Sequence, residues 1–519
     1  MQKSKFYIYF LFIIFCIFVI NACTNDGFVN PVAEKDEIVT HFRVQLSKNS
    51  ILRSATDSLD GTLAENKINK LSFFIIGLKD NNELDWTWVK HVSILAPHDL
   101  MNSPFTVLIK TTAGKKHVFV GANMSDAQIS SFCTNKGVYT SSENTYTDVK
   151  QDFADSLGRG FVMFGQMLNA TAPFSPDIEV VENDTIKATL ELSRVVSKVA
   201  LTYTPKTQGS KFAPLFQHPL IDGYIDVDSV YFMLNSTGKS IGFVPNGITY
   251  NLFDYIAPNV DPEYQTLYHY KVDPTQQFMF YSPQGVVQGN PLDYNVAAIK
   301  LPIEIQPGDE NPYCQGLEEY IPPSAATGDK HTHYKSSLYC LENKVNSSGF
   351  DAELLNEFRK GLNTHVIVAA KYVPKTIWHY DGSDIIDKTI SIDSDLFNVT
   401  NDDVDNGPYT FYAELISAVG DTPVLYKYYT YAAKKHLEQE ETAPNFITYK
   451  GGYGYYSTFV TQEALANDAD YDLNRNHYYI LNVKQFTPPG AVYPEQLYML
   501  VNSQTVEWKL QKEIDVPLD

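Results

Sequence analysis

The chain has 519 residues, of which 44% are hydrophobic and 19% are charged, so it is long enough for two or three folded domains. Its 35 tyrosines, 30 phenylalanines, 28 glycines and 27 prolines favour β-strands separated by turns. The net charge of −21 argues against a nucleic acid partner, because phosphates need compensating lysines and arginines. We therefore expect a β-rich protein with an acidic, well-solvated surface.

The N-terminus has the features of a bacterial lipoprotein signal. Two lysines precede the apolar run FYIYFLFIIFCIFVI (residues 6–20), which is short for a membrane span of about 20 residues but suits a signal peptide. The segment INAC that follows resembles a lipobox and ends in Cys23, whose thiol would carry the lipid. We expect residues 1–23 to be a lipoprotein signal peptide with its lipobox, and an uncleaved helical anchor is the alternative.

The other cysteines have no metal-binding pattern. Cys16 lies in the signal peptide, and Cys133, Cys314 and Cys340 remain, an odd number without CxxC spacing. At most one disulfide can form among these three, and a zinc site is not expected. Cys340 follows an apolar pattern and is predicted to be a small core residue.

No segment carries a complete metal-binding or catalytic motif. His331 and His333 could share one face of a strand, but they have no matching carboxylate nearby. Residues 401–407 and 468–472 resemble the start of a calcium loop. In the first segment, however, the position of the glutamate that would complete the loop holds Tyr412. We predict no metal, no cofactor and no enzymatic activity.

The first strand after the signal peptide is predicted over residues 38–47. Apolar and polar residues alternate there, which is typical of a half-buried strand. Its inward face would carry Thr40 together with four apolar residues: Ile38, Phe42, Val44 and Leu46.

Strands continue to recur along the chain, and helical periodicity is scarce. Short helices are predicted over 124–133, with Ser125 as its cap, and over 348–363. Many short strands with turn signals predict an all-β fold of β-sandwich domains, with a boundary near residue 205. The predicted strands cover residues 70–79, 105–112, 115–123, 159–167, 185–193, 196–204, 226–235, 294–305, 364–374, 423–434 and 475–486.

The last strand is predicted over residues 497–510 and is apolar in part on both faces. One face of this strand would carry Leu500, Val506, Trp508 and Leu510, and the opposite face would carry Val501. Such a strand is suited to burial in a partner.

An unusual arginine lies in KNSILRSATDSLDG (residues 48–61), directly after the first predicted strand. Arg53 is one of six arginines in the chain, against 34 lysines, and its surroundings are polar and rich in turn-forming residues. A protease can bind such an exposed segment in extended form. The alternative is an ordinary solvated arginine.

Several segments resemble, in chain order, the fimbrillins of Bacteroidia, which are the structural subunits of type V pili. The resemblance spans nearly the whole chain and is closest to the major subunits of short fimbriae. The segments are KHVFVGAN (116–123), SRVVSKVALTYT (193–204), LYCLEN (338–343), RNHYYILNVKQFTPPG (475–490) and LYMLVNSQTVEWKLQ (497–511).

This resemblance implies two transthyretin-like β-sandwich domains with a few short helices. It implies a propeptide with the first strand (24–53), an N-terminal domain (54–205) and a C-terminal domain (206–519) that ends in a donor strand at about 497–510. An arginine-specific protease would cut after Arg53, and the strand of another fimbrial subunit would replace the first strand.

The resemblance also implies a place and a set of partners. The precursor would be held by its lipid in the outer membrane, and the mature subunit would form part of a fimbrium on the cell surface. Its partners would be other subunits in a head-to-tail polymer, the processing protease and an adhesion ligand on a host or bacterial cell.

Two other functions remain open. A surface glycan-binding lipoprotein of a polysaccharide-uptake system would also be exported, acidic and aromatic, but would need neither a removable first strand nor a free last strand. A glycosidase would need a pair of carboxylates that the sequence does not identify.

Overall fold

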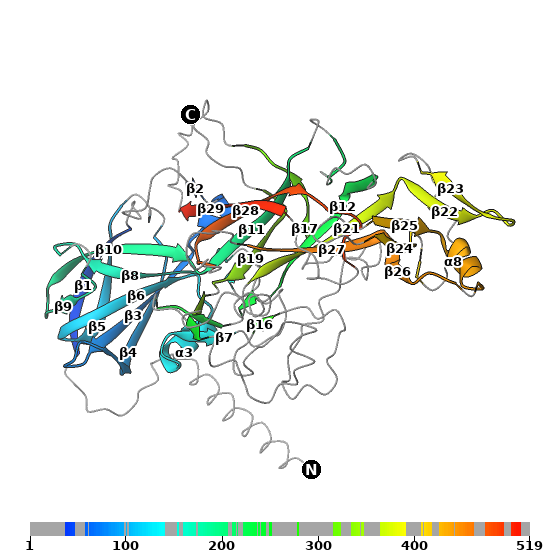
Figure 1. The fold of residues 1–519 in the computed structure, drawn as a ribbon. Coiled ribbons are helices and arrows are strands. Elements are labelled where there is room, and N and C mark those ends of the chain that lie inside the picture. Colours follow the sequence, from blue (N-terminus) through cyan, green and yellow to red (C-terminus); the bar gives the residue numbers. More distant parts are fainter. Residues whose placement is uncertain are drawn as a thin grey trace, which may run out of the picture. The chain divides into compact units, whose positions relative to one another are not determined.

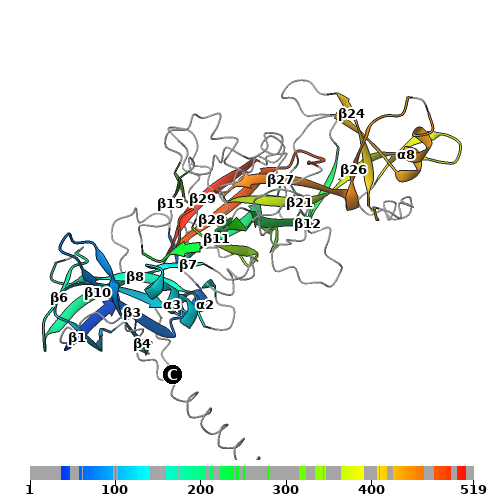
Figure 2. The same ribbon diagram turned by 90° about the horizontal axis from the view of Figure 1, so that it is seen from below.

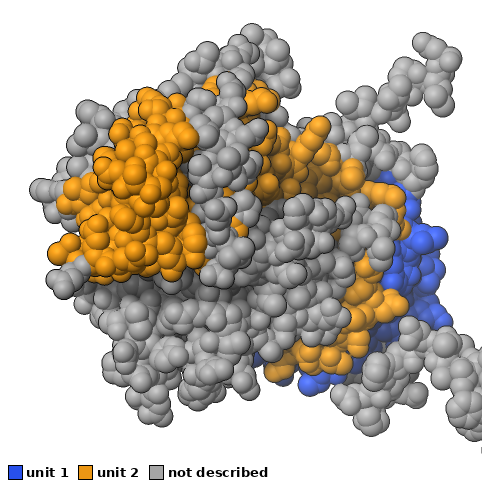
Figure 3. Space-filling view, turned by 90° about the vertical axis from the view of Figure 1, so that its right-hand side faces the viewer, with its two compact units in different colours: residues 1–47, 70–120, 165–191 blue, residues 48–69, 121–164, 192–519 orange. Residues whose placement is uncertain are grey.

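A computed structural model shows an all-β protein, as predicted, with three short α-helices among the described residues (Figure 1). The chain divides into unit 1 (residues 1–47, 70–120 and 165–191) and unit 2 (residues 48–69, 121–164 and 192–519), which Figure 3 shows in two colours. The structure describes residues 37–46, 58–60, 62–97, 100, 103–140, 153–154, 159–172, 175–205, 210–213, 215, 222–235, 237–238, 240–244, 249–251, 278–279, 315–322, 334–342, 344–346, 364–390, 406–407, 409–417, 425–440, 442–460, 473–491 and 500–509.

Most of unit 1 belongs to one eight-stranded sheet with the strand order β4-β3-β6-β8-β10-β1-β5, in which β9 pairs with β6. β3 is buried on both faces over residues 71–76, so it lies at the centre of the packing. The strands are β1 (Glu37–Leu46), β3 (Lys70–Leu78), β4 (Leu84–Leu95), β5 (Phe105–Thr112), β6 (Gly114–Ala122), β8 (Met163–Asn169), β9 (Ile178–Val180) and β10 (Thr185–Arg194).

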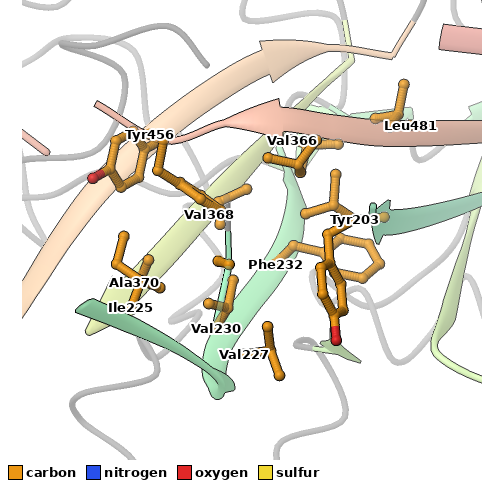
Figure 4. Close-up of a cluster of buried hydrophobic side chains, with 14 of the residues drawn as sticks. Tyr203, Ile225, Val227, Val230, Phe232, Val366, Val368, Ala370, Tyr456 and Leu481 are labelled. Carbon is orange, nitrogen blue, oxygen red and sulfur yellow. The ribbon is translucent and has the colours of Figure 1, made fainter. Parts of the chain in front are cut away.

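Two sheets of unit 2 face one shared core and form a β-sandwich (Figure 4). Leu481 points into this core from the first sheet, and Phe232 and Val368 point into it from the second. The first sheet has the order β18 (Glu318–Glu319), β11 (Val196–Tyr203), β28 (His477–Gln485), β29 (Leu500–Lys509) and β2 (Ser58–Asp60), with β19 (Ser337–Leu341) also paired to β11. The second has the order β17 (Gln315–Gly316), β12 (Gly223–Asn235), β21 (His365–Pro374) and β27 (Tyr453–Phe459).

A third sheet of unit 2 lies beside the short helix α8 (Tyr431–Leu437), as Figure 2 shows. The prediction of one strand over 423–434 is wrong in its second half, where the helix begins. Thr430 caps it by accepting a hydrogen bond from the backbone N of Ala433 at 3.4 Å, and Ala433 is fully buried. The sheet has the order β23 (Ile385–Thr389), β22 (Thr376–Tyr380), β25 (Leu425–Tyr429), β24 (Phe411–Ser417) and β26 (Phe446–Tyr449).

The remaining described elements are short. Helix α3 (Asp126–Thr134) begins after Ser125, whose side chain forms a capping box with Gln128, so the predicted cap is confirmed. The others are helix α2 (Leu63–Asn66), the 3-10 turn η3 (Lys450–Gly452), and the strand pairs β7 (Val138–Thr140) with β14 (Ser240–Gly242), β13 (Thr237–Gly238) with β16 (Phe278–Met279), and β15 (Thr249–Asn251) with β20 (Lys344–Asn346).

Eleven described strands lie within four residues of their predicted bounds: β1, β3, β5, β6, β8, β10, β11, β12, β21, β28 and β29. Apart from β25, the other described strands were not predicted, among them β4, β19, β22, β23, β24, β26 and β27. The division after residue 205 and the transthyretin-like topology remain predictions, and β11, which ends at Tyr203, lies in the first sheet of unit 2. Cys340 is buried in the sandwich core, as predicted, and Cys133 and Cys340 are free thiols. The predicted helix 348–363, the strand 294–305 and Cys314 lie outside the described residues.

Candidate functional site

The first strand, β1, lies inside the sheet of unit 1. It runs parallel to β10, from His41 opposite Thr185 to Leu46 opposite Leu190. On its other side it runs antiparallel to β5, from Glu37 opposite Thr112 onward. A strand that is paired on both sides has its backbone donors and acceptors satisfied by two neighbours, so its removal would leave two unpaired edges.

The inward face of β1 is buried as its alternation predicts. Phe42 and Val44 are fully buried and Leu46 is 4% exposed, whereas Ile38, at the start of the strand, is half-buried. Thr40 is also fully buried on this face. β1 is therefore a core strand of unit 1 and not a strand laid over its surface.

Hydrogen bonds and one ion pair hold β1 beyond its ladder. The Thr40 hydroxyl donates to the carbonyl of Asp184 at 3.3 Å, and the backbone N of His41 donates to the same carbonyl at 3.1 Å. Lys90 and Glu37 form an ion pair at 2.9 Å, in which both side chains are more than a third exposed. An exposed pair contributes little, so burial and the backbone ladders dominate.

The groove that holds β1 has walls from β5 and β10. Phe42 lies between Val107 and Ile186 in the register, and both of these side chains are buried. Val44 lies between Phe105 of β5 and Ala188 of β10, and Ala188 is the smallest of these wall residues. Removal of β1 would therefore leave, between β5 and β10, a largely apolar groove that is one strand wide.

The chain from β1 to β2 contains the predicted processing site. Arg53 and Cys23 both lie outside the described residues, so their roles remain predictions. β2 is the next described strand, and it pairs in parallel with β29, from Ser58 opposite Glu507 to Asp60 opposite Lys509. A cut after Arg53 would therefore disconnect β1 from β2.

Helix α2 follows β2 and is fastened into unit 2 by a buried polar network. Lys198 forms an ion pair with Glu65 at 2.8 Å, and both side chains are 4% exposed. The Tyr339 hydroxyl donates to the same carboxylate at 3.1 Å. Arg194 is fully buried, donates from Nε to the Glu65 carbonyl at 3.2 Å, and also donates to the Asn66 side chain.

This network is electrostatically costly and needs all of its partners. Burial lowers the pKa of Lys198 below its usual range, and the neighbouring Glu65 carboxylate opposes that shift. Its ammonium also lies 4.8 Å from the centre of the Tyr478 ring. Because breaking a buried pair leaves a charge uncompensated, the network fixes the chain that follows the predicted cut.

The predicted donor strand forms β29, whose backbone is paired within unit 2. It runs antiparallel to β28, from Val501 opposite Val483 to Glu507 opposite His477. Leu500, Val501, Val506 and Trp508 lie within this strand, whereas Leu510 lies outside the described residues. The strand must therefore leave β28 and β2 before it can serve as a donor, and its donor role remains a prediction.

The sequence of β29 at its core-side register positions is mostly polar. Tyr479 and Leu481 of β28 line the sandwich core, and the residues opposite them are Thr505 and Ser503. Val483 of β28 also lines this core, and the residue opposite it is Val501, so the sequence of β29 is polar at two of these three register positions.

Among the residues that the structure describes, no group of three or more His, Cys, Asp or Glu side chains could hold a metal ion. No helix in the described part of the chain is long and apolar enough to cross a membrane. His331, His333 and residues 401–405 and 468–472 lie outside the described part.

Sequence reasoning missed the polar network around Lys198. The signal that could have found part of it is the capping-box spacing of Thr62 and Glu65, which the structure realises with hydrogen bonds of 2.7 and 3.3 Å. Lys198 and Tyr339, the other partners of the Glu65 carboxylate, are more than 100 residues away in the chain, so nothing local identifies them.

No protein-family model and no curated protein sequence matches the chain. It is similar to a solved structure from Parabacteroides distasonis described as a cell adhesion protein, with 12% identity and a TM-score of 0.42 over 91% of this chain and 100% of that one. It is also similar to the fimbrilin FimA of Porphyromonas gingivalis W83 (12% identity, TM-score 0.38, 91% and 98% covered) and to the tip fimbrial protein Mfa3 of Porphyromonas gingivalis (11%, 0.35, 91% and 100%). These structural neighbours are fimbrial and cell adhesion proteins of Bacteroidia.

Proposed function

We propose that the chain is a structural subunit of a cell-surface fimbria, that it matures by proteolysis after Arg53, and that it polymerises by donor-strand exchange. The observation that carries this proposal is the position of β1: an N-terminal strand buried inside the sheet of unit 1, followed by a segment with an arginine. A cut at that arginine would separate β1 from the rest of the chain, so that another strand could replace it.

The energetics make an empty groove untenable. Phe42, Val44 and Leu46 are almost completely buried, and each such side chain contributes about 1.5–3 kcal/mol, so the three together contribute roughly 5–9 kcal/mol. Loss of β1 would also leave the facing backbone groups of β5 and β10 unpaired. A subunit without β1 must therefore bind a replacement strand, which is β-augmentation.

The replacement strand would come from the C-terminus of another subunit. β29 is held in its own sheet through backbone pairing, and the residues opposite Tyr479 and Leu481 of β28 are polar. Each subunit would then offer one strand and accept one. That contact is heterologous and builds an open filament.

In this proposal the precursor is a lipoprotein. Cys23 carries the lipid that holds it at the outer membrane, and the cut after Arg53 releases the mature subunit from that lipid. Its partners are the processing protease, further copies or other fimbrial subunits, and an adhesion ligand. An anchor subunit would retain its lipid, so the predicted cut favours a place in the stalk or next to the tip.

The maturation step is tested by N-terminal sequencing of the protein from the cell surface and by two substitutions. We expect a mature N-terminus at Ser54. Arg53→Ala should leave β1 in its groove and give a stable monomer, and Arg53→Lys should do nearly the same with an arginine-specific protease. Arg43→Lys, on the exposed face of β1, is the matched control and should mature normally.

Two results would contradict this proposal. Normal filaments from Arg53→Ala would place the processing site elsewhere. A purified mature protein that binds a polysaccharide tightly and never polymerises would instead favour a glycan-binding lipoprotein. Deleting residues 497–519 separates the two functions further, because the truncated subunit should cap growth and shorten filaments when it is mixed with wild type.

A further inference from the structure

The groove of unit 1 contains a polar group that β1 leaves unused. The Thr111 hydroxyl on β5 is fully buried and has no hydrogen-bond partner among the residues that the structure describes. Thr111 lies opposite Ile38 in the register, and an isoleucine side chain can neither donate nor accept a hydrogen bond. A strand with a hydrogen-bonding side chain at this position would complement the groove better than β1 does.

The groove also prescribes an order of polar and apolar residues. The inward positions of β1 hold Ile38, Thr40, Phe42, Val44 and Leu46, so one buried polar residue is followed by three apolar ones. The carbonyl of Asp184 is within hydrogen-bond distance at the position of Thr40. Ala188, the smallest residue of the groove walls, lies beside the position of Val44.

We propose that residues 502–510 of a second copy replace residues 38–46 in the same direction, with Asn502 opposite Thr111. This register rests on the proposed strand exchange. It assigns every second residue of the donor to one of the inward positions that β1 occupies. Asn502 can hydrogen-bond to the Thr111 hydroxyl, and Gln504 takes the position of Thr40. Trp508 lies beside Ala188, where the wall is smallest.

The two remaining inward positions are apolar, as the groove requires. Val506 takes the place of Phe42, and Leu510 takes the place of Leu46 beside Leu190. The volume that is lost from Phe42 to Val506 adjoins the volume that is gained at Trp508, so one change offsets the other.

Other registers bury groups that the groove cannot satisfy. A shift of two residues in one direction places Gln504 between Val107 and Ile186, and a shift in the other direction places Lys512 beside Leu190. A shift of one residue turns Glu507 inward. If the donor ran in the opposite direction, its apolar residues Val506, Trp508 and Leu510 could occupy the three apolar positions only if Lys512 took the fully buried position of Thr40.

The consequence is a preference of the groove for the donor over its own first strand. With β1 in place, no described residue pairs with the Thr111 hydroxyl, whereas the donor gives it a partner, so the exchange adds a hydrogen bond. Asn502 is therefore the specificity-determining residue of the donor, and Thr111 is that of the acceptor.

The register is tested by disulfide trapping. Leu108 on β5 is 52% exposed and lies opposite His41, so the proposed register places residue 505 of the donor there. The full chain with Leu108→Cys is treated with an arginine-specific protease in the presence of a synthetic peptide of residues 498–512 that carries Thr505→Cys. Peptides with Ser503→Cys or Glu507→Cys are the matched controls.

We expect the Thr505→Cys peptide to cross-link to position 108 in preference to both controls, as measured by peptide mass mapping. Preferential cross-linking of a control peptide would overturn the register and leave strand exchange intact. If none of the peptides is retained by the cleaved chain, the proposed function itself fails.

The contact between Thr111 and Asn502 is tested by a double-mutant cycle with the same peptide. Asn502→Leu should weaken peptide binding to the cleaved wild-type chain by about tenfold, because it leaves the buried hydroxyl unpaired. On a chain with Thr111→Val, which removes the hydroxyl at nearly constant shape, the same peptide change should cause no loss. Equal losses on both chains would overturn the pairing.

Discussion

Substitution of Phe42 should destabilise the precursor and leave the mature filament unchanged. Phe42 is fully buried between Val107 and Ile186 in the middle of β1. Truncating a buried phenylalanine to alanine typically costs 3–5 kcal/mol, which is roughly half of the 5–9 kcal/mol that the three buried apolar residues of β1 contribute together. Phe42→Ala should therefore loosen the sheet of unit 1 around β1.

The assay is hydrogen exchange of the amides of β5 and β10 in the uncleaved chain, because it reports on unit 1 without requiring a single unfolding transition. We expect these amides to exchange faster in Phe42→Ala, and the exposed Arg43→Ala to serve as a neutral control. Filaments from the same variant should resist denaturant as wild type does, because β1 is absent from them. Filaments that are weakened as much as the precursor would refute the reasoning, since β1 would then remain in its groove.

Four further perturbations have defined expected outcomes. Lys198→Met should lower the free energy of unfolding by about 3–5 kcal/mol in chemical denaturation, because it removes the cation that compensates the buried Glu65 carboxylate. Burial raises the pKa of Tyr334 from 10.0 to about 12, so the unfolded state releases the hydroxyl proton at a lower pH than the folded state does. The stability of the fold should therefore fall as pH rises from 10 to 12, which a pH series of denaturation midpoints measures. Cys23→Ala should abolish acyl-chain labelling and retain the precursor in the inner membrane, which fractionation would show. A disulfide between Ser58→Cys and Glu507→Cys should hold β29 against β2 and block polymerisation until it is reduced.

The extended strands and their faces could be predicted from the sequence because they depend on nearest neighbours. The alternation from Ile38 to Leu46 predicts both the strand β1 and its buried face, and the structure confirms Phe42, Val44 and Leu46 in the core. A helix cap is equally local, since Ser125 and Gln128 satisfy each other across three residues. The all-β class follows from many such local signals.

The tertiary structure alone decided which strands became neighbours. β1 pairs with β10 although the two are separated by about 140 residues of chain, and this pairing turns a predicted strand into an inner one. Segments that are distant in the chain also set the ion pair of Glu65 with Lys198 and the surroundings of the Thr111 hydroxyl, which has no partner in the described part of the chain. Alternation specifies which face of a strand is buried, but strand order and register depend on long-range packing, so only the assembled sheets reveal the groove that β1 fills.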